Sequence, residues 1–225
     1  METEIRKTFS IEDIIASSWR LTWANLGTLV LVTFIAFMIY AAVHLFTNSF
    51  IQPIGNVVGS FLAGLINTIV GCLLGIGLIN VSLKVTNLEP ISVGDMFSKL
   101  NLFINYFICT IIENLVVGIG LILLIIPGIF FLVRFSLGLY VLVDRDLGPI
   151  EALQRSWKIV RGCSWKVLGL ILVCLLIDFV GLCLLVVGLL VTIPITIIAF
   201  ALLYRELEAQ TFKEVVHTPE VEIIP

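Results

Sequence analysis

The sequence predicts an all-α integral membrane protein with six transmembrane helices arranged as three hairpins, each preceded by a short cytoplasmic amphipathic helix. Three observations support this fold class. The chain has 225 residues, of which 60% are hydrophobic and 13% are charged, whereas a soluble domain is about half apolar and about a quarter charged. Its apolar residues form runs that are too long for the helices of a soluble core. Its positive charges are confined to a few short segments.

The positive charges divide the chain into charged segments and apolar blocks. All thirteen Lys and Arg residues except Arg134 lie in the charged segments. Under the positive-inside rule these segments are cytoplasmic, so each apolar block crosses the membrane an even number of times and both termini are cytoplasmic. The predicted single membrane domain consists of an amphipathic segment at 1–25, a hairpin at 26–83, an amphipathic segment at 84–101, a hairpin at 102–143, an amphipathic segment at 144–166, a hairpin at 167–204 and a tail at 205–225.

Each apolar block has a predicted turn with one proline. The block at 102–143 shows this most clearly, because a single helix of that length, at about 1.5 Å per residue, would be roughly twice as long as the bilayer is thick. We expect this block to turn at Pro127 and Gly128. The other two blocks are expected to turn near Pro53 and Pro194.

A short pattern recurs before each hairpin and predicts an internal repeat of one structural unit. Ser10 and Ser92 are each followed three positions later by an acid, as in a helix N-cap with a capping box. Gly148 begins a third copy, with Pro149 directly after it. Apolar residues then follow at helical spacing. Chance similarity between short caps is the alternative interpretation.

The predicted amphipathic helices carry aromatic and basic side chains that suit the membrane–water interface. We expect the aromatic rings to lie in the headgroup layer and the cations to face anionic lipid. A role limited to orienting the spans is an equally good interpretation. The residues predicted at the lipid interface are Trp19, Arg20, Arg155, Trp157, Lys158 and Arg161.

Three charged residues, Glu113, Arg134 and Asp178, lie inside the apolar blocks. A charge at the bilayer centre costs at least about 2.5 to 3.5 kcal/mol, so another group must offset that cost. One hypothesis is structural. Either Arg134 forms an ion pair with Glu113 across the second hairpin or with Asp178 instead, or the acids are protonated, neutral and hydrogen-bonded within the helix bundle. The other hypothesis is a path for protons or a substrate. The asparagines that would assist such a path are Asn67, Asn80, Asn105 and Asn114.

The chain from the second predicted turn to the third amphipathic segment contains a series of short motifs. They are Ile126-Pro127-Gly128-Ile129, Arg134, Tyr140-Val141-Leu142-Val143-Asp144, Gly148-Pro149-Ile150-Glu151-Ala152-Leu153 and Ser156-Trp157-Lys158. Over about a quarter of the chain, this series resembles a bacterial family of six-span inner-membrane proteins of largely unknown function. That family is related to the membrane-anchoring domain of some glycerophosphoryl diester phosphodiesterases. The resemblance implies a helical domain in the bacterial plasma (inner) membrane and does not imply phosphodiesterase activity.

The sequence has no pattern that predicts catalysis. Its two histidines are His44 and His217, and it lacks the HExxH, GxSxG and phosphate-loop patterns. Its five cysteines have no paired spacing and are expected to be small apolar packing residues. We therefore expect no enzyme activity, no cofactor and no metal site.

The leading hypothesis is a non-enzymatic membrane module that organises or binds lipid or a protein partner at the cytoplasmic leaflet. Its expected partners are the phospholipid bilayer, including anionic lipid, and a membrane protein or a second copy of the chain. No basic tract predicts binding to nucleic acid. A small transporter or channel that uses Glu113, Arg134 and Asp178 is the main alternative, and a lipid-modifying enzyme is the third.

Overall fold

The protein is helical, with six candidate membrane spans. The computed structural model describes residues 7–51 and 56–212, and its secondary structure in these ranges includes no strand. The predicted fold class is therefore confirmed at the level of an all-α protein with six helical segments that are long and apolar enough to cross a membrane. These segments are Leu26–Ile51, Val57–Thr86, Val93–Leu123, Ile125–Arg145, Ser164–Cys183 and Gly188–Phe212.

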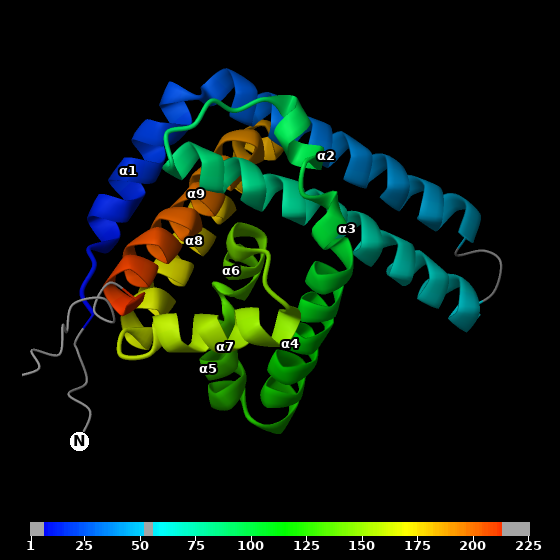
Figure 1. Cartoon of the computed structure of the whole chain (residues 1–225). Coiled ribbons are helices and arrows are strands. Elements are labelled where there is room, and N and C mark those ends of the chain that lie inside the picture. Colours follow the sequence, from blue (N-terminus) through cyan, green and yellow to red (C-terminus); the bar gives the residue numbers. More distant parts are fainter. Residues whose placement is uncertain (1–6, 52–55, 213–225) are drawn as a thin grey trace, which may run out of the picture.

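Helix α1 (Ile11–Ala24) precedes the first span. It begins at the predicted N-cap, because the Ser10 hydroxyl accepts a hydrogen bond from the backbone nitrogen of Asp13. The chain then bends into α2 (Leu26–Phe46). Figure 1 shows α1 lying along the last helix, α9 (Leu185–Phe212), whereas α2 runs away from it.

The first two spans form a pair whose far end, near residues 51 and 56, extends away from the other helices (Figure 1). α2 continues through a π-helical stretch, η1 (Thr47–Ile51), and α3 (Asn56–Thr86) returns beside it. Pro53, where the sequence predicts the turn, lies outside the described residues. Apolar side chains near this end of the pair, such as Val57 and Phe61, are exposed and are suited to contact with lipid.

The segment after α3 differs from the single amphipathic helix that the sequence predicts. It forms two short 3₁₀ helices, η3 (Val93–Phe97) and η4 (Leu100–Leu102). The predicted capping box is present, because the Ser92 backbone nitrogen donates to the Asp95 carboxylate and the Ser92 side chain accepts from the backbone of Asp95. The Asn80 amide of α3 donates to the backbone carbonyl oxygen of Asp95. This contact competes for the carbonyl that a continuing α-helix would use.

The third and fourth spans turn earlier in the chain than predicted. α4 (Phe103–Leu123) ends at Leu124, whose backbone is extended, and α5 (Ile125–Phe135) follows directly. Pro127 and Gly128 therefore lie in the first turn of α5, so the predicted turn position is wrong. Proline is tolerated there because the first backbone N–H groups of a helix have no intrahelical partner.

Two glycines allow α4 and α5 to approach closely beside this turn. A Cβ atom on Gly120 would lie 2.9 Å from the Cα atom of Gly128. A Cβ atom on Gly128 would lie 2.6 Å from the backbone nitrogen of Leu121. Real Cβ atoms do not approach other atoms so closely, so this contact depends on glycine, as in other close helix pairs in membranes.

The fourth span is interrupted after α5. A break at Ser136 and Leu137 separates α5 from α6 (Gly138–Arg145), which lies in the middle of the molecule in Figure 1. Val141 and Leu142 of α6 are completely buried. α6 therefore forms the centre of the core, and the surrounding helices pack on it.

Helix α7 (Pro149–Val160) forms where the third amphipathic helix is predicted, with Gly148 as its N-cap and Pro149 in its first turn. Its apolar face packs against protein, because Ala152 and Ile159 are completely buried and α7 contacts α4, α5, α6 and α9. This face therefore covers the core, and only the opposite face is available to a membrane surface or a partner.

The last two spans, α8 (Ser164–Cys183) and α9, meet at Leu184, so the predicted turn at Pro194 is wrong. Pro194 lies inside α9 and is buried. Proline is tolerated within membrane helices because neighbouring groups can satisfy the backbone carbonyl that it frees. α9 runs on to Phe212, so part of the predicted tail continues the last span as a helix.

Replacing Gly128 with alanine is expected to lower the free energy of unfolding by about 1 to 3 kcal/mol, the usual cost of overpacking. The added Cβ atom would push against Leu121 of α4. The matched control is Gly118→Ala, because a Cβ atom on Gly118 would have open space around it, with no atom of another helix within 4 Å. Thermal unfolding in detergent measures both variants. Equal melting temperatures for the two would contradict the close approach of α4 and α5.

Candidate functional site

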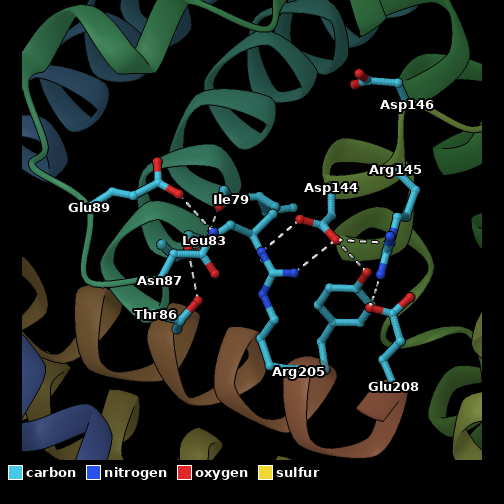
Figure 2. Close-up of polar contacts among 12 residues, drawn as sticks. Ile79, Leu83, Thr86, Asn87, Glu89, Asp144, Arg145, Asp146, Arg205 and Glu208 are labelled. Carbon is cyan, nitrogen blue, oxygen red and sulfur yellow. Dashed lines mark hydrogen bonds and ion pairs between the residues drawn. The ribbon is translucent and has the colours of Figure 1, made fainter. Parts of the chain in front are cut away.

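Five charged side chains from three helices form an ion-pair cluster at one end of the molecule. Figure 2 shows the part of it around Asp144. The Arg205 guanidinium donates to both oxygens of Asp144, from Nη2 to Oδ1 at 2.7 Å and from Nη1 to Oδ2 at 3.1 Å. The Tyr204 hydroxyl donates to Oδ2 at 2.7 Å. A two-point contact between arginine and a carboxylate fixes orientation as well as distance. The cluster comprises Asp144 and Arg145 of α6, Arg155 of α7, and Arg205 and Glu208 of α9.

Glu208 is the second centre of the ion-pair cluster. Its side chain is only 6% exposed. One oxygen accepts from Nη2 of Arg145 at 3.0 Å, and the other accepts from Nη2 and Nε of Arg155 at 2.9 and 3.1 Å. The Arg155 guanidinium also lies over the Phe212 ring, 3.9 Å from its centroid. These contacts join α6, α7 and α9.

The electrostatics of the cluster indicate a structural role. Three arginines and two carboxylates leave it with one net positive charge. A buried carboxylate without a partner would be strongly destabilising. Both carboxylates are engaged by arginine, so neither is available as a general base. The arrangement therefore holds helices together and does not resemble a proton-transfer site.

The sequence analysis did not predict this cluster. It assigned Arg155 to the lipid interface and residues 205–225 to a tail. Arg205 and Glu208 instead lie on the helical extension of α9, three positions apart and thus on one side of the helix. This spacing was the available signal in the sequence, but it did not identify partners on other helices.

The segment before α1 attaches to the same end of the molecule. Lys7 Nζ donates to the backbone carbonyl oxygens of Lys158 and Ile159, both at 2.8 Å, at the C-terminal end of α7. Carbonyl groups at a helix C-terminus lack intrahelical donors, so the lysine satisfies them. Thr8 and Gln210 exchange two further hydrogen bonds, at 3.2 and 2.9 Å. Both ends of the described chain therefore meet near the ion-pair cluster.

Arg134, predicted to be a buried charge, joins α5 to α7. Its guanidinium lies 5.0 Å from the centroid of the Phe130 ring and 4.9 Å from that of the Trp157 ring. Its Nη1 donates to the backbone carbonyl oxygen of Trp157 at 3.2 Å. The ion pairs of the described residues do not include Arg134 with Glu113. That predicted pair is wrong, because α7 lies beside Arg134 and supplies the rings and the carbonyl group.

The two acids predicted within the spans lie in separate surroundings. Glu113 is half-buried on α4. Asp178 of α8 lies beside the hydroxyl groups of Thr192 and Thr196 on α9, and its buried Oδ1 atom has no hydrogen-bond partner among the described residues. Within the described ranges, no ion pair joins any two of the three predicted charges.

The residues predicted for the lipid interface divide into two groups. Arg155 belongs to the ion-pair cluster, and Trp157 packs against three phenylalanine rings of α5. Trp165, which the sequence analysis did not single out, is 85% exposed at the start of α8. The exposed members of the predicted set are Trp19, Arg20, Lys158 and Arg161.

Metal-binding and thiol chemistry have little support among the residues that the structure describes. No group of three or more His, Cys, Asp or Glu side chains there could hold a metal ion. The five cysteines are free thiols, and only Cys183 is exposed. Burial raises the pKa of the Cys163 thiol between α7 and α8, so its reactive thiolate form is scarce at neutral pH.

The fold and the cluster define a class: a multi-pass α-helical membrane protein whose charged side chains pair at one end. The chain belongs to the family described as "Domain of unknown function (DUF7847)", whose model matches residues 53–221. It is similar to "UPF0259 membrane protein SG1383" of Sodalis glossinidius (strain morsitans), with 32% identity over 96 residues. That match covers 42% of this chain and 37% of the relative. No solved structure matches.

These findings support a bacterial membrane family of unknown function, as the sequence motifs implied. The chain covers well under two thirds of the relative's length. The family description and the relative's name do not mention a phosphodiesterase. The resemblance to the anchoring domain of those enzymes therefore stays a prediction.

Replacing Glu208 with glutamine is expected to lower the free energy of unfolding by about 3 kcal/mol, the low end of the cost of breaking a buried ion pair. Arg145 and Arg155 lose their shared partner, but both are partly exposed and water can solvate them. The matched control is Glu206→Gln on the same helix, expected to change stability by less than about 0.5 kcal/mol. Melting temperatures in detergent measure the difference. If the two variants have the same melting temperature, the Glu208 ion pairs do not stabilise the protein.

Proposed function

We propose that this protein is a non-enzymatic membrane module that binds and organises anionic lipid at the cytoplasmic leaflet of the bacterial inner membrane. The observation that carries the proposal is an exposed basic corner where α7 meets α8. This basic corner is defined by Lys158, Arg161, Trp165 and Lys166, all of which are exposed.

Among the described residues, no acid forms an ion pair with the basic corner. The sequence contains no Asp or Glu between Ala152 and Ile177. The ion pairs of the described residues do not include Lys158, Arg161 or Lys166. Exposed tryptophan beside lysine and arginine is typical of side chains in the headgroup layer, where basic residues attract anionic lipid. A lipid phosphate is therefore the partner that best fits the corner.

Because the apolar face of α7 is buried, only its exposed basic side is available for contact with lipid. That face is occupied by protein, so α7 cannot lie on the membrane by immersing it. Contact with lipid would instead be electrostatic, through the exposed cations, and would be assisted by the Trp165 ring. An acidic protein partner would use the same cations and is the second ligand class consistent with the corner.

The proposed orientation follows from the same charges. The positive-inside rule would place the ion-pair cluster and the basic corner in the cytoplasm, and the turns at Leu124 and Leu184 outside. A transporter that uses Glu113, Arg134 and Asp178 has less support, because Arg134 is engaged by the rings and the carbonyl group around Trp157.

The double variant Lys158→Glu, Arg161→Glu is expected to retain less anionic lipid than the parent protein. Each basic residue near a membrane surface contributes about 1 kcal/mol of attraction, so the loss of two cations removes at least about 2 kcal/mol. The measurement is phosphatidylglycerol retained by the full chain in native mass spectrometry, after reconstitution with phosphatidylglycerol and phosphatidylcholine. The charge-conserving variant Lys158→Arg, Arg161→Lys is the control. Unchanged retention in the charge-reversed protein would overturn the proposal.

Single-cysteine labelling tests the orientation. Cys163 is buried, so a cysteine at the exposed Gln154 is the better probe of the α7 side. We expect a membrane-impermeant maleimide to label Gln154→Cys only from the cytoplasm and Asn48→Cys only from outside. Both variants also carry Cys183→Ser, because Cys183 is the exposed native cysteine, and the Cys183→Ser protein with its four buried cysteines gives the background. The reverse pattern would invert the proposed orientation.

A further inference from the structure

One face of α4 is left uncovered by the other described helices. α4 lies at an edge of the molecule in Figure 1, and its other sides contact α3, α5, α6 and α7. The uncovered face carries two rows of residues spaced four apart, and such rows are the ridges that interdigitate when two helices cross. One row is Asn114, Gly118 and Ile122, and the other is Ile111, Leu115 and Ile119. All of these residues are exposed except Gly118, which is half-buried.

Gly118 makes a close approach of another helix possible. A Cβ atom on Gly118 would have open space around it, with no atom of another helix within 4 Å. Gly120 differs, because a Cβ atom there would lie 2.9 Å from the Cα atom of Gly128 on α5. Close helix pairs in membranes use small residues where the two backbones meet. Gly120 serves this purpose for α5, and Gly118 offers the same opportunity on the uncovered face.

Asn114 puts a carboxamide group on this face near the middle of the span. It lies about 16 Å from the start of α4 and about 14 Å from its end, at about 1.5 Å per residue. Within the described ranges its exposed side chain makes no hydrogen bond. Lipid chains suit the isoleucine and leucine side chains, but they cannot hydrogen-bond to an amide, which is therefore costly in hydrocarbon. A polar group on another molecule is the contact that this face lacks.

Glu113, the preceding residue, does not belong to the uncovered face. It interacts electrostatically with Tyr106 and Cys109, and both of these are buried. Successive residues of an α-helix are rotated by about 100°, so Glu113 is directed toward the protein while Asn114 is directed away from it. A partner on this face therefore meets an amide and not a charge.

A second copy of the chain supplies a matching polar group by symmetry. A carboxamide is both a donor and an acceptor, so two asparagines can satisfy each other. In a twofold symmetric pair of copies inserted in the same direction, each residue lies at the same depth as its counterpart. The two Asn114 side chains then meet near mid-membrane without any further requirement. An unrelated membrane protein would need a polar side chain placed separately at that depth.

We propose that α4 forms the interface of a homodimer, in which the Asn114 side chains of the two copies hydrogen-bond to each other and Gly118 lets the two helices cross closely. The rows spaced four apart on each copy interdigitate, which gives a right-handed crossing of the kind that small residues permit. The interface lies within the spans and shares no residue with the basic corner. The proposal therefore does not depend on lipid binding there.

Crosslinking tests the interface in membranes. Leu115→Cys is expected to give a covalent dimer with a short bifunctional maleimide, because residue 115 of each copy would lie near the crossing. The matched control is Leu175→Cys on α8, since Leu115 and Leu175 are 60% and 61% exposed and each lies eight residues before the end of its helix. Both full-length variants also carry Cys183→Ser, which removes the exposed native cysteine. Equal dimer yields from the two positions would overturn the proposal.

Substitution of Asn114 tests the hydrogen bonds. The measurement is the dissociation constant of the dimer, from energy transfer between labelled full chains in phosphatidylcholine vesicles. Asn114→Leu is expected to raise it about tenfold, because each of the two symmetric hydrogen bonds contributes about threefold. Asn114→Gln keeps a carboxamide and is expected to stay within about threefold of the wild-type value. A monomeric wild-type chain, or an unchanged dissociation constant in Asn114→Leu, would contradict the assignment.

Substitution of Gly118 tests the close crossing in the same measurement. Gly118→Ile is expected to abolish energy transfer, because a branched side chain would keep the two backbones apart. The position is open within one copy, so the variant should fold. Gly118→Ala is the matched control and should still dimerise, since alanine is also a small residue. Equal energy transfer in the two variants would show that α4 does not cross a second copy at Gly118.

Discussion

The pairing of Asp144 and Glu208 with three arginines constrains how the helix ends can be arranged. A carboxylate at the end of an apolar helix is destabilising unless a cation lies against it. Glu208 meets this condition only because α9 continues as a helix beyond its apolar part and reaches Arg155 on α7. Asp144 in turn holds α6 against α9 through Arg205. The positions of α6, α7 and α9 therefore depend on one another.

The position of α7 has two consequences for function. Its apolar face covers α6, so the amphipathic character of this helix serves the protein core and not immersion in lipid. Its other face leaves Lys158 and Arg161 exposed beside Trp165. The same placement gives Arg134 its aromatic neighbours and the carbonyl group of Trp157. The packing of α7 on the core thus determines both which cations are exposed for the proposed lipid contact and which groups surround Arg134.

The polar side chains of α3 and α4 are satisfied in a different way from those of the ion-pair cluster. In the cluster, opposite charges on different helices satisfy one another within the protein. On α3 and α4, Asn67, Thr68 and Thr110 donate to groups nearby in the chain or on the adjoining π-helical stretch, while Asn67 Oδ1 is left without a partner in the described chain. Polar groups inside membrane helices are costly and often mark functional sites. The cluster therefore stabilises the arrangement of α6, α7 and α9, whereas Asn67 keeps an unmatched acceptor inside the spans.

The sequence by itself determined the all-α class, the six spans and the N-cap at Ser10, because run length, charge distribution and caps depend on residues close together in the chain. It did not determine the turns, since Pro127 and Pro194 fit the first turn or the interior of a membrane helix as well as a bend. Only the tertiary structure decided which charges pair. Arg155 and Glu208 are 53 residues apart, and their contact depends on how whole helices pack, which no local pattern encodes.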